Sequence, residues 1–124
     1  MIEHVSIHVS DYEKAKALYS AALKPLGYKL NMEYGTAAGF MEGGHTSFWI
    51  VEQKKVIPTH IAFRAKNKNA VHDFHTAALE AGAKDNGKPG PRPDYSPDYY
   101  AAFFLDEDGN NVEAVWYDPD KAEK

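Results

Sequence analysis

The sequence has 124 residues, of which 44% are hydrophobic and 26% are charged, and its formal net charge is −4. This length suits a single compact domain, and this composition excludes a disordered or fibrous chain. Cysteine is absent, which excludes disulfides, thiolate metal sites and cysteine nucleophiles.

The charge pattern and the start of the chain also limit the partners. The 14 Lys and Arg residues are scattered, so there is no basic stripe of the kind that binds nucleic acid. Residues 1–11 lack a basic segment followed by an apolar run, and no stretch approaches the roughly 18 apolar residues of a membrane helix. We therefore expect a cytoplasmic protein that acts on a small molecule, with no nucleic acid or membrane partner.

The first half of the chain matches the second half when the two are aligned at an offset of 56 positions. At this offset His4 meets His60, and an Ala-Ala-Leu tripeptide recurs without a gap. Identities of this kind at one offset indicate an internal duplication. We therefore predict one domain over residues 1–124 that contains two half-domains about a pseudo-twofold axis, with module one at about residues 1–56 and module two at about residues 57–118.

Each module opens with a predicted strand. Residues 4–9 alternate aliphatic side chains with His4 and His8, and residues 60–65 repeat the alternation behind His60. A period of two is typical of a half-buried strand, so each histidine lies on the face opposite the aliphatic residues.

An amphipathic helix is predicted after each of these strands, because apolar residues recur there every three or four positions. The first helix begins behind Asp11 as N-cap and ends near Gly27. The second begins behind Asn67 or Asn69 and ends before Gly82.

Short strands are predicted after each helix, bounded by turn residues. They cover residues 28–34, 36–41 and 46–51 in module one and residues 99–105 and 111–117 in module two, after a weak strand near Lys84. The proline-rich segment 88–98 is predicted to be a loop. Each module therefore has the order βαβββ, and the fold class is α+β.

Three residues are candidates for a metal site. His4 and His60 hold equivalent positions in equivalent strands, so a pseudo-twofold axis would point both into one concave face. Glu113 lies inside an apolar strand, where a carboxylate is costly to desolvate unless a positive charge pairs with it. Two imidazoles and one carboxylate suit a divalent ion such as Zn, Ni, Mn or Fe(II) and leave positions open for water or substrate.

The same motifs resemble those of the vicinal-oxygen-chelate superfamily, which contains glyoxalases, bleomycin-resistance proteins and extradiol dioxygenases. The resemblance rests on His4 followed by residues 9–11, on His60, and on residues 106–110 leading to Glu113, and it covers essentially the whole chain. It implies an open, cup-shaped mixed sheet around a divalent metal held by His4, His60 and Glu113, and it implies a homodimer.

The chain departs from the family pattern at one position. Members of the family usually take a further ligand from the last strand of module one, where glyoxalase I has a glutamate that matters for proton transfer. This chain has Phe48, Trp49 and Ile50 there, and Glu52 lies at the end of that strand. The three remaining ligands match the two-histidine, one-carboxylate set that extradiol dioxygenases use for Fe(II).

Further residues are expected to contact a substrate. In the segment 87–100, Arg92 can clamp a carboxylate or phosphate, and the tyrosines offer stacking faces or, alternatively, edge packing or a dimer contact. His8 shares a face with His4, and its repeat partner Arg64 could hold an anionic substrate or pair with a surface carboxylate. The predicted substrate contacts are His8, Trp49, Arg64, Arg92, Tyr95 and Tyr100.

The predicted function is that of a metal-dependent enzyme in which Glu113 carries a proton and the metal chelates two substrate oxygens. Lyase or isomerase chemistry of the glyoxalase kind and dioxygenase cleavage both fit this ligand set. One alternative is a protein that sequesters an antibiotic or metabolite, although the similar bleomycin-resistance proteins generally lack the metal ligands. Another is a regulatory or structural module that holds an ion and no substrate.

Overall fold

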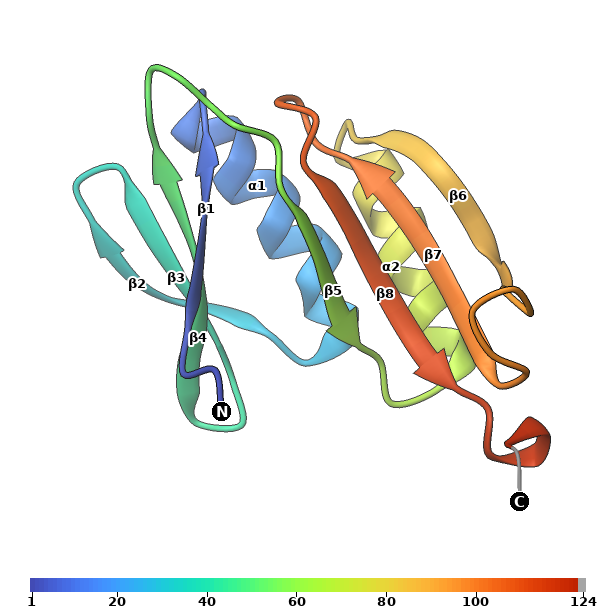
Figure 1. Ribbon diagram of the computed structural model, residues 1–124. Helices are drawn as coiled ribbons and strands as arrows, with labels where there is room; N and C mark the ends of the chain where they lie inside the picture. Colours follow the sequence, from blue (N-terminus) through green and yellow to red (C-terminus); the bar gives the residue numbers. More distant parts are fainter. Residues whose placement is uncertain (123–124) are drawn as a thin grey trace.

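The computed structural model describes residues 1–122, so the last two residues of the domain predicted over 1–124 lie outside the described residues. Its elements form two successive βαβββ modules, as the duplication predicts (Figure 1). Each module has a four-stranded mixed sheet, in which the first strand pairs in parallel with the last. The prediction of an α+β fold with two tandem modules is confirmed.

Module one begins with a strand followed by a helix. Its elements are β1 (Val5–Val9), α1 (Tyr12–Leu23), the short 3-10 helix η1 (Lys24–Leu26), β2 (Lys29–Tyr34), β3 (Ala37–Glu42) and β4 (His45–Glu52). The strand order in the sheet is β1-β4-β3-β2. The Asp11 side chain accepts a hydrogen bond from the Lys14 amide at 3.1 Å, so Asp11 caps α1 as predicted.

Module two repeats this arrangement and ends in a further short 3-10 helix. Its elements are β5 (His60–Arg64), α2 (Lys68–Glu80), β6 (Lys84–Pro91), β7 (Tyr99–Leu105), β8 (Asn111–Tyr117) and η2 (Pro119–Lys121). The strand order is β5-β8-β7-β6. Of the two predicted N-cap candidates, Asn67 caps α2, because its side chain accepts a hydrogen bond from the Ala70 amide at 2.8 Å.

The prediction of a loop over residues 88–98 is wrong for its first four residues, since β6 continues to Pro91. The order of the sheet places β6 at its edge, beside β7. Its register shifts between Asp85 and Gly87 and again between Gly87 and Gly90. Proline lacks an N–H group, which an edge strand tolerates on its unpaired side. The irregular pairing explains why the alternation along β6 is too weak to predict the whole strand.

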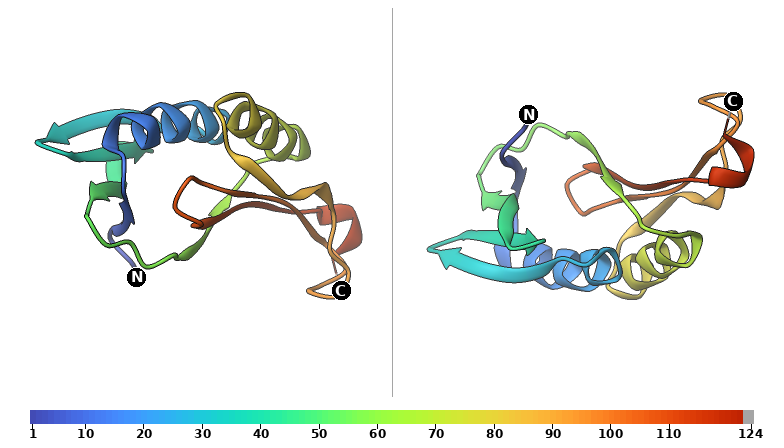
Figure 2. Two further views of the ribbon diagram at one scale, coloured as in Figure 1. Left: turned by 90° about the horizontal axis from the view of Figure 1, so that it is seen from above. Right: turned by 90° about the horizontal axis from the view of Figure 1, so that it is seen from below.

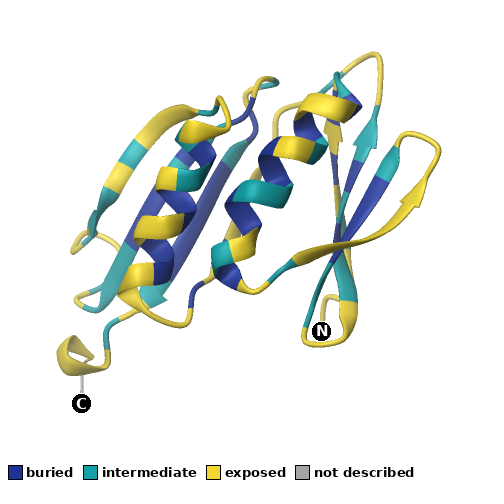
Figure 3. Cartoon of the chain, turned by 180° about the vertical axis from the view of Figure 1, so that it is seen from behind, coloured by how far each residue is buried: buried dark blue, intermediate teal, exposed yellow. Residues whose placement is uncertain are grey.

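The two helices lie side by side along one side of the molecule, and the two sheets lie on the other side (Figure 2). The buried residues follow the helix faces and the strands that are turned toward each other (Figure 3). The opposite face of each sheet is turned away from the helices. None of the helices within residues 1–122 is long and apolar enough to cross a membrane.

An aromatic core joins the two modules. The Tyr19 ring of α1 lies 5.5 Å from the Phe48 ring of β4, and Phe48 meets Phe63 of β5 edge-on at 5.0 Å. Tyr19 also contacts Phe104 of β7 at 6.1 Å, and Phe104 packs on Phe74 of α2 at 5.2 Å. The core therefore runs without interruption from one module into the other.

A buried polar network at the β7–β8 turn fixes the modules relative to each other. Asp106 accepts hydrogen bonds from the Tyr19 hydroxyl at 2.7 Å and from the Asn110 side-chain amide at 2.8 Å. Asn110 also donates to the backbone carbonyl of His8 at 3.1 Å and accepts from the Thr59 amide at 2.8 Å. Because Asn110 is completely buried, water cannot replace these partners.

Candidate metal centre

His60 and Glu113 lie together on the face of the second sheet that is turned away from the helices. Strands β5 and β8 run parallel, with His60 paired to Asn111 and Ala62 paired to Glu113, so alternation projects both side chains from this face. Nε2 of His60 lies 3.1 Å from Oε1 of Glu113. The His60 side chain is 52% exposed and that of Glu113 only 3%, so solvent reaches the pair from the histidine side.

A hydrogen bond at the other ring nitrogen fixes the tautomer of His60. Nδ1 lies 3.0 Å from the backbone carbonyl oxygen of Asn111, which can only accept, so Nδ1 carries the hydrogen. In the neutral imidazole, Nε2 then points a lone pair at an oxygen of Glu113, and this contact is unfavourable unless a cation lies between the two atoms.

These two residues fit a divalent metal ion. A histidine that binds a metal usually donates its other N–H to a carbonyl or carboxylate group, as His60 does to Asn111. Two ligand atoms that each lie about 2.0–2.2 Å from one ion are roughly 3 Å apart, which is the spacing of Nε2 of His60 and Oε1 of Glu113.

Tyr99 completes the surroundings of Glu113, and the sequence analysis missed it. Its hydroxyl donates a hydrogen bond to Oε2 of Glu113, while Oε1 faces His60. Burial and this hydrogen bond raise the pKa of Tyr99 well above its usual value, so the hydroxyl remains a donor at neutral pH. The short β7–β8 turn pairs Phe103 with Glu113, and alternation from Phe103 puts Tyr99 on the same face. Counting residues outward from the turn could have identified Tyr99.

His4 lies just before β1, on the other sheet. Its side chain is 55% exposed, and its Nδ1 atom lies 2.5 Å from Oε1 of Glu3. The other carboxylate oxygen of Glu3 lies 2.9 Å from Nε2 of His45. Within residues 1–122, no group of three or more His, Asp or Glu side chains is placed to hold one metal ion. A single chain therefore brings together two of the three predicted ligands.

Trp49 occupies the position in module one that corresponds to Glu113. Ser6 pairs with Trp49 across β1 and β4, as Ala62 pairs with Glu113 across β5 and β8. The indole lies so close to Gly39 that a Cβ atom added there would come within 2.8 Å of it. Module one therefore has an apolar wall where module two has a carboxylate.

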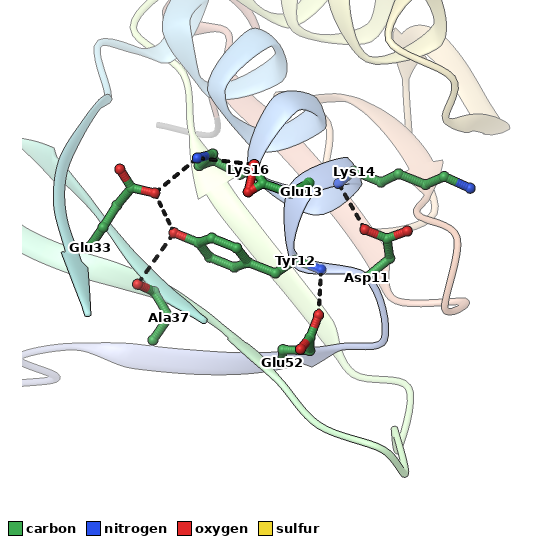
Figure 4. A network of polar contacts seen from close by, with 8 residues as sticks. All are labelled: Asp11, Tyr12, Glu13, Lys14, Lys16, Glu33, Ala37 and Glu52. Carbon is green, nitrogen blue, oxygen red and sulfur yellow. Dashed lines mark hydrogen bonds and ion pairs between the residues drawn. The ribbon is translucent and has the colours of Figure 1, made fainter. Parts of the chain in front are cut away.

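The side chain of Glu52 is engaged elsewhere, at the start of α1 (Figure 4). Its Oε1 atom accepts a hydrogen bond from the Tyr12 amide at 2.9 Å. The Tyr12 hydroxyl donates to Glu33 of β2 at 2.5 Å, and Lys16 pairs with the same carboxylate at 2.9 Å. Burial, followed by the bond to Glu33, raises the pKa of Tyr12 to about 12. These contacts hold the edge strand β2 and the end of β4 against α1.

Two of the predicted substrate contacts lie in and beside the loop after β6. The Arg92 guanidinium lies 5.5 Å from the Phe103 ring, which in turn stacks against the His60 ring at 6.4 Å. The Tyr95 ring meets the Tyr99 ring edge-on at 5.1 Å. One aromatic ring therefore lies between each of these residues and the His60–Glu113 pair: Phe103 for Arg92 and Tyr99 for Tyr95.

Tyr100 lies on the opposite face of the sheet. Its hydroxyl is 2.6 Å from Nε2 of His72 on α2, and its ring meets Trp116 edge-on at 6.1 Å. Neighbouring strand residues face opposite sides, so Tyr99, and not Tyr100, faces Glu113.

The other predicted contacts divide between the two sheets. His8 and Trp49 belong to the first sheet, together with the strand that follows His4. Arg64 ends β5 on the same face as His60, with its guanidinium 4.9 Å from the Tyr117 ring. Within one chain, the second sheet alone carries the His60–Glu113 pair.

Among the hollows on the surface of residues 1–122, two are prominent. The larger, about 610 Å³, lies between α1, the end of α2 and the β7–β8 turn, and it contains none of the predicted site residues. The smaller, about 550 Å³, lies at the ends of β5 and β8 and includes Arg64 and Tyr117. Of these two, the smaller therefore adjoins the face of the second sheet that carries His60 and Glu113.

Known proteins share both the sequence pattern and the fold. The family model of the Glyoxalase/Bleomycin resistance protein/Dioxygenase superfamily matches residues 1–114. The chain is similar to a glyoxalase/bleomycin resistance protein from Albidiferax ferrireducens T118, with 25% identity and a TM-score of 0.82 over 92% of this chain and 97% of that chain. No curated protein matches the chain.

Two more distant structures share the fold. One is the genomically encoded fosfomycin resistance protein FosX from Listeria monocytogenes, with 17% identity and a TM-score of 0.71 over 98% of this chain and 96% of that chain. The other is a mutant of glyoxalase I from Zea mays, with 22% identity and a TM-score of 0.69 over 91% of this chain and 45% of that chain. Because the family model spans most of the sequence, the chain belongs to the Glyoxalase/Bleomycin resistance protein/Dioxygenase superfamily.

Proposed function

We propose that this chain is a divalent-metal-dependent enzyme that acts on a small, oxygen-rich substrate, with His60 and Glu113 as two of the metal ligands. The observation that carries the proposal is the 3.1 Å approach of two acceptor atoms, Nε2 of His60 and Oε1 of Glu113. Asn111 holds the other nitrogen of the imidazole and Tyr99 holds the other oxygen of the carboxylate. Both ligand atoms are therefore oriented before any ion binds.

The third proposed ligand is the partner subunit's His4, in a homodimer. The Nδ1 atom of His4 is engaged by Glu3, which leaves Nε2 free for an ion, as at His60. In a twofold dimer, the first sheet of one protomer can face the second sheet of its partner, and both sites are then equivalent. The separation of His4 from the pair within one chain supports this assembly.

The chain's own residues have distinct proposed roles in the reaction. When bound, the ion would supply Lewis-acid stabilisation of negative charge on the substrate oxygens. Glu113 would accept or donate a proton, and the neutral Tyr99 hydroxyl would hold its carboxylate in place. The reaction is of the lyase, isomerase or dioxygenase type. Trp49 in place of a module-one carboxylate argues for a reaction other than that of glyoxalase I.

The test is an elemental analysis of the purified protein, followed by oxygen-uptake measurements. We expect about one divalent ion per chain in the wild type, and a loss of the ion in His60→Ala and Glu113→Gln. The matched control is His72→Ala, which removes an imidazole from α2 on the other face of the sheet. Oxygen uptake by the Fe(II) protein with a catechol would identify a dioxygenase. A wild-type protein that binds no divalent ion would contradict the proposal and favour sequestration.

A further inference from the structure

Arg64 ends β5 on the same face of the second sheet as His60 and Glu113. Its guanidinium lies 4.9 Å from the Tyr117 ring, a contact that fixes its position. Within residues 1–122, no ion pair or hydrogen bond occupies its N–H groups. A guanidinium that is fixed in this way presents its donors to a ligand that approaches the sheet.

Arg64 also lines the hollow of about 550 Å³ at the ends of β5 and β8. The charged residues of this hollow are Arg64, Lys66 and Glu42, two cations and one acid. The hollow is therefore locally positive, although the whole chain carries a formal charge of −4. Aromatic side chains, including Tyr28 and Tyr117, form part of its lining.

A chain of contacts joins this hollow to the metal centre. The Tyr117 ring meets the Tyr99 ring edge-on at 5.4 Å, and the Tyr99 hydroxyl bonds to Glu113. Arg64 lies two residues beyond Ala62, which pairs with Glu113. Two residues of a strand span about 7 Å. A molecule longer than this spacing would be needed to reach from Glu113 to Arg64 along the face of the sheet.

Arg92 differs from Arg64 because backbone carbonyls occupy its guanidinium. Its Nη1 donates to Gly90 at 2.9 Å and to Pro91 at 3.3 Å, and its Nη2 donates to Lys88 at 2.7 Å. These bonds make Arg92 a brace of its own loop. Of the two arginines on this face, Arg64 has the donors available for a ligand.

We infer that Arg64 binds the anionic group of the substrate, so that the substrate class is a small organic anion, a carboxylate or a phosphoryl compound. The inference rests on the proposed function, in which the other end of the substrate binds at His60 and Glu113. A fork of N–H donors matches both kinds of oxyanion. The aromatic rings beside Arg64 favour an anion that carries a flat or apolar body.

The test is calorimetric binding of three probes of similar shape: phenyl phosphate, benzoate and neutral benzyl alcohol. The protein is titrated both as purified and after treatment with a chelator, so that direct coordination of a probe to an ion can be recognised. We expect at least one of the two anions, phenyl phosphate or benzoate, to bind at least about tenfold more tightly than benzyl alcohol. Binding should weaken as the salt concentration rises.

Substitutions at Arg64 then locate the binding. We expect Arg64→Gln to weaken anion binding at least about tenfold and Arg64→Lys to weaken it less, because lysine keeps the charge and loses the fork. The matched control is Lys55→Gln, which removes one charge from the exposed linker before β5 and should leave the affinity unchanged. Since Arg64 is exposed, its substitution should leave the fold intact.

Three outcomes would overturn the inference: equal binding of benzyl alcohol and the anions, no measurable binding of either anion, or an unchanged affinity in Arg64→Gln. A zinc titration of the same variants separates this result from the proposed function. If Arg64→Gln takes up zinc normally and keeps its anion affinity, only the inference about Arg64 fails. If the wild type takes up no metal but binds the anion, and Arg64→Gln does not bind it, only the proposed metal function fails.

Discussion

The Tyr99 hydroxyl donates a hydrogen bond to Oε2 of Glu113, which leaves Oε1 of the same carboxylate directed at His60. The bond joins β7 to β8 at the position where Glu113 is almost completely buried. A buried carboxylate needs such a donor, because the charge is otherwise costly to remove from water. Tyr99 thus determines which oxygen of Glu113 is available to a cation.

We predict that Tyr99→Phe folds normally and binds zinc more weakly, by about tenfold or more, the usual cost of removing a group that orients a metal ligand. Zinc affinity measured by competition with a chelating dye checks this. Tyr95→Phe is the control, because the Tyr95 side chain is exposed and its ring meets the edge of the Tyr99 ring, whereas the Tyr99 hydroxyl bonds to Glu113. Equal zinc affinities of Tyr99→Phe and the wild type would contradict the assigned role of Tyr99.

A second prediction concerns Tyr12 and alkaline pH. Tyr12→Phe removes the bond to Glu33 and should lower the free energy of unfolding by about 1 kcal/mol at pH 7. The fold raises the pKa of Tyr12 to about 12. The pKa of tyrosine in an unfolded chain is about 10. The contribution of Tyr12 to the free energy of unfolding is therefore complete below about pH 10 and is lost as the pH rises through about 12.

Urea denaturation of the wild type and Tyr12→Phe at several pH values between about 8 and about 11.5 measures this effect. The difference in free energy of unfolding should be constant up to about pH 10 and then shrink. A difference that stays constant over the whole range would show that the Tyr12–Glu33 bond does not couple proton binding to stability.

A third prediction concerns the buried network at the β7–β8 turn. Asn110→Ala leaves the Thr59 amide and the His8 carbonyl without their partners. We expect the free energy of unfolding to fall by about 2–4 kcal/mol, since unsatisfied buried polar groups are costly. Asn86→Ala, at an exposed position, should change it by less than about 0.5 kcal/mol. Similar losses in the two variants, measured by urea denaturation, would exclude a special role for Asn110.

A fourth prediction tests whether two protomers share each metal site. His4→Ala and His60→Ala chains should each lose zinc binding when purified alone. When the two chains are mixed and reassembled, half of the dimers are mixed, and each mixed dimer has one complete site. About a quarter of the wild-type zinc capacity should therefore return. If no capacity returns although mixed dimers form, the proposed contribution of the partner subunit's His4 is wrong.

The sequence predicts most of the fold because the duplication and the alternation of side chains are strong signals. The alternation behind His4 and His60 identifies β1 and β5, and Asp11 correctly marks the start of α1. The full length of β6 escapes prediction, since two register shifts and an edge position weaken its pattern.

The site was harder to predict, because a sequence gives the face of a residue only when the register is known. Glu113 was identified from its charge inside an apolar strand, and the structure places it against His60. Tyr99 and Tyr100 are neighbours of the same type, and the register of the β7–β8 hairpin is needed to tell which one faces Glu113. Equivalence in the duplication placed His4 next to a matching strand, but it could not show that His4 and the His60–Glu113 pair belong to different sheets of the chain.

The most direct test of the metal centre is a crystal structure of the protein soaked in zinc, with anomalous diffraction measured at the zinc absorption edge. We predict an anomalous peak about 2.0–2.2 Å from both Nε2 of His60 and Oε1 of Glu113. A zinc-saturated crystal with no peak between these two atoms, and with His60 and Glu113 joined directly by a hydrogen bond, would contradict it.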